Sequence, residues 1–191
     1  GANHNIIDGV EKYQNLLDGT IYDIKLYNRA LTESEIKQNY NLDKDKYSSD
    51  NYVEDDLVIH LDGTNKGDTE GIWQDLSGNN NHGTIKGATY NGVNGFEFDG
   101  TDDYVAFDDQ HFYENVTMEA VVSIEDLSKT SSIIAVAEDG GYVILSGSNV
   151  LLPEVYVDRT WANLPYDKYT PGDLVHIAYT IDSSYHKLYI D

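Results

Sequence analysis

Carboxylates are the residues of this sequence best suited to chemistry, and their spacing decides which chemistry they could do. A glycosidase built on a β-sheet needs two carboxylates close together on one face, one as the acid and one as the nucleophile or base. Glu119 lies in an alternating stretch over 116–122, and the next acids, Glu125 and Asp126, follow in a turn beyond it. We therefore interpret Glu119 as structural and expect no hydrolase activity.

A second set of acids falls in turns beside expected strands. Oxygen-rich turns of this kind suit Ca²⁺, which accepts many oxygen ligands in irregular geometry. Asp-Gly is also ordinary turn chemistry, and in that interpretation the acids serve solubility. Both interpretations stay open, and the first predicts calcium as a cofactor. The candidate ligands are Asp62, Asp99, Asp102 and Asp103.

An asparagine-rich loop and two aromatic residues are the candidates for contacting a sugar. Amide side chains both donate to and accept from hydroxyl groups, and exposed aromatic rings stack on sugar rings. Alternatively, the asparagines bond their own backbone and Trp73 fills the core, which is the interpretation we favour for the loop. The candidate ligand-binding residues are Asn79, Asn80, Asn81, Trp161 and Tyr166.

Charge and composition exclude several classes of partner. The chain has 34 acidic residues against 12 Lys and Arg, which gives a net charge of −22. Such a charge argues against nucleic acid and against an anionic membrane surface. No apolar run is long enough to insert into a membrane. The absence of cysteine excludes disulfides and thiol catalysis, and the histidines show no zinc-binding spacing.

The first third of the chain predicts a strand followed by a short helix. Residues 21–27 alternate in period two, with Tyr22, Ile24 and Leu26 on one face, so we expect a strand with one buried face. Thr32 and Glu35 form a capping box, which predicts a helix over 32–40. The charged, aperiodic residues 41–54 read as a connection.

From residue 56 onward the sequence predicts only β-structure. Short alternating or apolar runs are separated by Gly, Asn and Asp, which tolerate the backbone of tight turns. Many short strands with such turns are typical of a sandwich or barrel. The clearest strand candidates are residues 57–62, 96–99, 116–123, 174–181 and 186–190.

Five blocks, in order, resemble the laminin G-like branch of the concanavalin A-like lectin and glucanase jelly rolls. The third, Phe98 to Val105, resembles that family's F-D-G-x-x-D-Y-V strand, and in the fourth Val121 stands where a Trp is usual. The second, Trp73 to Thr84, resembles its W-x-D-x-S-G-N-x-N-x-G-T loop. The other blocks are residues 57–63, 117–122 and the strand pair 176–182 with 187–191.

The order of these resemblances along the chain is rotated. Residues 1–46 resemble the last strands and closing helix of such a domain, 47–54 read as a linker, and 55–191 resemble its beginning. The two parts could complete one sandwich within the chain, complete it between chains, or belong to a tandem array. We favour one composite sandwich, because an unfinished half would expose a long unpaired edge. This predicts that strand 21–27 pairs with strand 56–62.

The resemblance implies an all-β, concanavalin A-like jelly-roll sandwich with one short helix. It implies a non-catalytic binding or adhesion module that is secreted or exposed on a cell or virion surface, with a glycan or another cell-surface ligand as its partner. The alternative is a structural repeat of a surface or virion fibre, completed by copies of itself or by neighbouring repeats. Fold alone does not decide between these functions.

Overall fold

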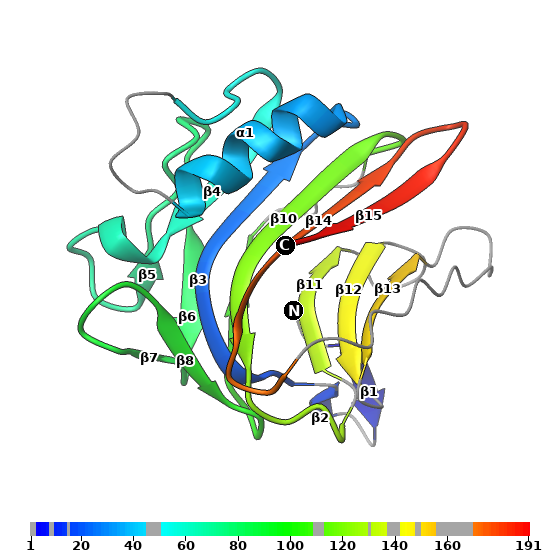
Figure 1. Cartoon of the computed structure of the whole chain (residues 1–191). Coiled ribbons are helices and arrows are strands. Elements are labelled where there is room, and N and C mark those ends of the chain that lie inside the picture. The colour runs from blue at the N-terminus through cyan, green and yellow to red at the C-terminus, as the bar shows by residue number, and fades with distance from the viewer. Residues whose placement is uncertain are drawn as a thin grey trace.

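The protein is described here from a computed structural model of the whole chain (Figure 1). The structure describes residues 3–7, 10–14, 16–44, 51–108, 113–129, 131–136, 142–147, 150–155 and 170–191. The fold is all-β with antiparallel sheets and one α-helix among the described residues, as the sequence predicts.

The strands form one large sheet and three small ones. The large sheet has seven strands in the order β15-β14-β10-β3-β8-β7, and β4 also pairs with β3. The small sheets are β5-β6-β9, β11-β12-β13 and the hairpin β1-β2. In chain order the elements are β1 (Asn3–Ile7), β2 (Val10–Gln14), β3 (Asp18–Tyr27), α1 (Glu33–Lys44), β4 (Leu57–Asp62), the 3-10 helix η1 (Gly63–Asn65), β5 (Ile72–Trp73), β6 (Gly83–Lys86), β7 (Thr89–Tyr90), β8 (Phe96–Asp99), β9 (Tyr104–Ala106), β10 (Val116–Ile124), β11 (Ser131–Val136), β12 (Tyr142–Gly147), β13 (Val150–Val155), β14 (Leu174–Ile181) and β15 (His186–Ile190).

Strand β3 pairs with later strands of the same chain on both of its sides. β3 pairs antiparallel with β10 along one side, and with β8 and β4 along the other. The register with β4 runs from Asp23 opposite Asp62 to Tyr27 opposite Leu57. The predicted pairing of residues 21–27 with residues 56–62 is therefore confirmed, and β3 lies in the interior of the sheet (Figure 1). Residues 45–50, within and beside the expected linker 47–54, lie outside the described residues.

The two faces of the large sheet are covered by different layers. One face packs against the small sheets around Trp73 and Ile133, and forms the main apolar core. Helix α1 lies across the other face, over β3 and β4, as Figure 1 shows. A second, smaller apolar cluster sits beneath it and consists of Tyr27, Leu31, Ile36, Val53 and Ala178.

The expectation that β3 has one buried face is wrong, because α1 covers the second. Asp23, Lys25 and Tyr27 are all buried on the side that the alternation left for solvent. The β3 residues that enter the main core also differ from the expected set. The pairing with β10 passes from Asp23 to Ile21 while β10 advances one residue, so Tyr22 is the extra residue of a bulge. Ile21 thereby joins Ile24 and Leu26 in the main core, and Tyr22 is only half-buried.

The helix is longer than the predicted 32–40. Its start agrees with the capping box: the Thr32 amide donates to the Glu35 carboxylate at 2.8 Å, and the Glu35 amide donates to the Thr32 hydroxyl at 3.4 Å. Its end extends to Lys44 because Leu42 is buried and Asp43 reaches the sheet, contacts that no local period reveals. No helix in the described part of the chain is both long and apolar enough to cross a membrane.

Candidate functional site

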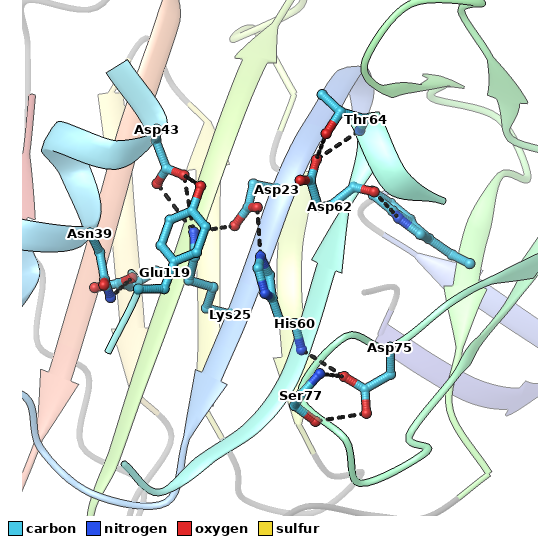
Figure 2. A network of polar contacts seen from close by, with 12 residues as sticks. Asp23, Lys25, Asn39, Asp43, His60, Asp62, Thr64, Asp75, Ser77 and Glu119 are labelled. Atoms are coloured by element: carbon cyan, nitrogen blue, oxygen red, sulfur yellow. Dashed lines mark hydrogen bonds and ion pairs between the residues drawn. The ribbon is translucent and has the colours of Figure 1, made fainter. Parts of the chain in front are cut away.

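Beneath α1 lies a buried ionic cluster centred on Lys25. Lys25 Nζ donates to Asp23, its neighbour on the same face of β3, and lies 3.1 and 3.2 Å from the two carboxylate oxygens of Asp43 on α1. The ammonium also sits 4.1 Å from the centre of the Tyr52 ring. Lys25 is 0% exposed, so these contacts replace water completely. Figure 2 shows the lysine between its two carboxylates.

Each carboxylate of the cluster has a second partner. Asp23 Oδ2 lies 3.1 Å from His60 Nε2 on β4, and the Tyr52 hydroxyl donates to Asp43 Oδ1 at 2.8 Å. The ring of Tyr52 meets that of His60 edge-on at 5.0 Å between centroids. The cluster therefore ties together β3, β4, α1 and the segment that precedes β4.

Asn39 of α1 forms the other half of the buried polar layer. Its amide nitrogen donates to the Tyr27 hydroxyl and to Glu119 Oε2, both at 2.8 Å, and its amide oxygen accepts from the Val53 backbone at 3.0 Å. One side chain thus joins the helix to β3, to β10 and to residue 53. The second oxygen of Glu119 has no hydrogen-bond partner among the described residues.

Burial and pairing set the charge of each group. Burial opposes ionisation of Asp23, but the charge of Lys25 and the bond from His60 hold its pKa below the ordinary value. Burial likewise opposes the charge on Lys25, yet Asp23 and Asp43 hold its pKa well above the usual range. Lys25 and Asp23 are therefore charged at neutral pH.

Asp43, Glu119 and His176 are shifted toward their neutral forms. Burial raises the pKa of Asp43 to about 6 and that of Glu119 to about 8, and Lys25 offsets part of each shift. Burial also lowers the pKa of His176, with the Lys25 charge adding to the effect, to about 4. At neutral pH Lys25 is consequently a cation, Asp23 and Asp43 are carboxylates, Glu119 is protonated and His176 is neutral.

The sequence pattern did not reveal this cluster. Glu119 was interpreted as structural, and the geometry is that of a buried hydrogen-bonding residue. The spacing of the histidines gives no indication that His60 and His176 belong to the cluster. A signal was present in Asp23 and Lys25, two polar residues two apart in a strand followed by a helix that carries Asn39 and Asp43 four apart on one face.

The asparagine loop between β5 and β6 is organised around the buried carboxylate of Asp75. This carboxylate accepts from the His60 backbone at 2.9 Å, from the amide and hydroxyl of Ser77 at 2.9 and 2.8 Å, and from the Asn81 amide at 2.9 Å. The side chains of Asn79 and Asn81 donate to the Val58 carbonyl of β4 at 3.2 and 2.9 Å. Figure 2 shows Asp75 and Ser77 beside His60.

These bonds agree with the packing interpretation of the loop. Trp73 is 1% exposed and sits in the main core. Asn80 is exposed, and its positive φ of 61° places it at the tip of the turn. Of the other candidate sugar contacts, Trp161 and Tyr166 lie outside the described residues.

Three of the four candidate metal ligands are brought together. One carboxylate oxygen from each of Asp99, Asp102 and Asp103 lies within 4.8 Å of the others, in the turn after β8. Asp62 is not part of the group. Its carboxylate caps the 3-10 helix, accepting from the amide and hydroxyl of Thr64, both at 2.7 Å. Burial raises the pKa of Asp103, an effect opposed by the bond from the Asp99 amide.

Comparisons with known proteins match nothing. No protein-family model matches the chain, no curated protein is significantly similar to it, and no solved structure is either.

Glu119 should make stability fall as the pH rises above neutrality. Its folded-state pKa of about 8 lies above the ordinary carboxyl value of 4.5, so between these values the folded chain keeps a proton that the unfolded chain has lost. Because the folded chain holds this extra proton, the free energy of unfolding should fall by about 1–2 kcal/mol between about pH 6.5 and about pH 8.5. Asp43, with a pKa of about 6, has largely lost its proton below this pH window. His176 opposes the fall in stability only near the lower end of the window, where the unfolded chain still protonates it in part. Urea unfolding across the window measures the slope.

Glu119→Gln is the control for this titration, because Gln has the shape of the protonated acid and can still accept from Asn39. It should flatten the dependence on pH. A slope that is the same in E119Q would assign the titration to another group.

The Asp75 loop should prove structural when its central carboxylate is removed. Asp75→Ala leaves the backbone N–H groups of His60, Ser77 and Asn81 without their acceptor, so we expect a loss of about 2–4 kcal/mol of unfolding free energy. Asn80→Gly is the matched control in the same loop, because Gly accepts the positive φ and stability should be unchanged or higher. Chemical denaturation of both variants measures the difference. Equal stability of D75A and the parent chain would contradict the packing role.

Calcium binding by the turn of Asp99, Asp102 and Asp103 stays a prediction. If it binds Ca²⁺, millimolar calcium should raise the melting temperature, because a ligand of the folded state stabilises that state. Magnesium should do less, since it needs near-ideal octahedral geometry. Asp102→Asn should remove the calcium effect, whereas Asp68→Asn, an equal change of charge at an exposed site elsewhere, should keep it. A melting curve indifferent to both calcium and EDTA would dismiss the site.

Proposed function

We propose that this chain is a non-catalytic binding or adhesion module of the laminin G-like jelly-roll type, secreted or exposed on a cell or virion surface, with glycan as its ligand class. The five ordered sequence blocks and the all-β fold support the proposal. The intramolecular pairing of β3 with β4 agrees with a composite sandwich made from the two parts of the chain.

The observation that carries the non-catalytic character is the burial of Glu119. It is 1% exposed beneath α1 and bonded to Asn39. A sugar cannot reach it without displacing the helix. Asp43 and Asp23, whose charges act on Glu119, have side chains that are 7% and 8% exposed and serve as partners of Lys25.

The sugar-binding role rests on fewer side chains than the sequence suggests. The amides of Asn79 and Asn81 are occupied by the backbone of β4, which leaves Asn80 exposed at the tip of the loop. The aromatic candidates Trp161 and Tyr166 therefore become the side chains most worth testing, since ring stacking is the other common way to hold a sugar.

A glycan array, run with and without calcium, tests the proposal. The whole chain should retain a defined set of glycans, and Trp161→Ala or Tyr166→Ala should reduce the signal by roughly tenfold, equivalent to about 1.4 kcal/mol. Val93→Ala, at an exposed apolar residue in a different loop, should leave the signal unchanged. Release of reducing sugar from β-glucans would contradict the non-catalytic assignment, and an array without any specific signal would contradict glycan binding.

A second candidate function is a structural repeat of a fibre. The observation that favours it is the construction of the large sheet: β3 supplies an interior strand, while β15 at one edge pairs only with β14 among the described strands. A sheet whose edge strand has one partner among the described strands suits end-to-end assembly.

A further inference from the structure

The edge strand β15 presents unused backbone hydrogen-bonding groups. Among the described strands β15 pairs only with β14, with Ile190 opposite Ile177 and His186 opposite Ile181. His176 and Asp191 exchange both of their backbone bonds, at 2.9 and 3.1 Å. Because hydrogen-bonded and non-hydrogen-bonded pairs alternate in an antiparallel ladder, the backbone N–H and C=O groups of residues 186, 188 and 190 point away from β14.

The same edge leaves the main core partly uncovered. Leu188 and Ile190 pack against that core but remain only half-buried. Their counterparts on β14, Ile177 and Tyr179, are 0% exposed because they have a strand on both sides. A further strand beside β15 would satisfy the outward backbone groups and cover these two side chains together.

The hairpin β1–β2 forms a two-stranded sheet of its own among the described strands. Its register runs from Asn3 opposite Gln14 to Ile7 opposite Val10, and within the described residues neither strand pairs with a third. An isolated two-stranded hairpin is marginally stable in water, and a third strand or a packing partner is needed to hold it.

The hairpin of the same chain cannot lie beside β15. Three strand spacings separate β3 from β15 in the sheet, and a strand beyond β15 adds a fourth, which makes about 19 Å. From Gln14, the end of β2, to Asp18, the start of β3, the chain has four residue steps and spans at most about 14 Å. In Figure 1 the hairpin accordingly lies apart from β15. A hairpin that reaches this edge must come from another molecule.

Charge permits this contact although the chain as a whole is strongly acidic. β15 contains Lys187 and His186 and no acid, and the two strands of the hairpin contain a single acid, Glu11, next to Lys12. In a chain with a net charge of −22, these are segments that can approach a second copy without like-charge repulsion.

We propose that β15 accepts the outer edge of β1 from the β1–β2 hairpin of a second copy, which extends the seven-stranded sheet from one molecule to the next. Each copy has one donor and one acceptor, so the contact is heterologous and repeats head to tail. The inference rests on the proposed role as a structural repeat, and it names the partner and the two surfaces.

Crosslinking tests the contact directly, because the chain has no cysteine of its own. Asn5→Cys, at the centre of β1, is mixed with Leu188→Cys under mild oxidation. We expect a disulfide-linked heterodimer on the order of tenfold more abundant than with Val93→Cys, the matched control, whose exposed thiol lies away from the edge. Equal yields of heterodimer from Leu188→Cys and from Val93→Cys, each mixed with Asn5→Cys, would overturn docking at β15. A predominant L188C homodimer would also overturn it, since β15 would then pair with itself.

Sedimentation of the full chain over a range of concentrations gives a second readout. The parent chain should associate as its concentration rises, and Leu188→Pro should lower the association constant at least tenfold. Proline removes the outward N–H of residue 188, which the β14 ladder does not use. Because Leu188 also packs against the core, some loss of melting temperature is expected, and a cooperative unfolding transition with the circular dichroism of the parent chain verifies the fold. Association that persists in L188P would overturn this site but leave the structural-repeat role standing. A parent chain that stays monomeric throughout would overturn both.

Discussion

The positive charge of Lys25 is the constraint on which the rest of this sheet face depends. A fully buried ammonium group is very costly unless it is paired and hydrogen-bonded. Asp23 is available on the same strand, but the second carboxylate must come from another element, and Asp43 supplies it from the last turn of α1. Helix position, helix length and the path of the chain into β4 all follow from bringing that carboxylate to the lysine.

The polar layer under α1 also explains why the helix sits in one place. An apolar interface alone would tolerate sliding, since hydrophobic contact is non-directional. Asn39 forms hydrogen bonds with β3, with β10 and with the segment before β4. Asp43 is held by Lys25 and Tyr52. These directional bonds specify the register of the helix on the sheet. The protonated Glu119 takes part without adding a charge that would need its own partner.

The sequence predicted those features that local chemistry controls. Alternation located β3, β4, β14 and β15, the capping box placed the start of α1, and the turn residues marked the hairpins. It missed what depends on distant contacts: the second buried face of β3, the bulge at Tyr22, and the last turn of α1. Of the candidate metal ligands, Asp99, Asp102 and Asp103 lie together, whereas Asp62 lies outside the group and caps the 3-10 helix η1, a contact that depends on the local fold. The ionic cluster was missed because its members look solvent-exposed until α1 is docked.

The interior position of β3 affects how the chain folds during synthesis. Tyr27 pairs with Thr117, a partner 90 residues later in the sequence. At a translation rate of about 5–20 residues per second, β3 waits roughly 5–18 s for that partner to be made. β4, whose Leu57 pairs with Tyr27, is made only 30 residues after it, so during this interval β3 can pair on that side while its β10 side stays open. An interior strand of the mature fold therefore spends part of synthesis as an edge strand.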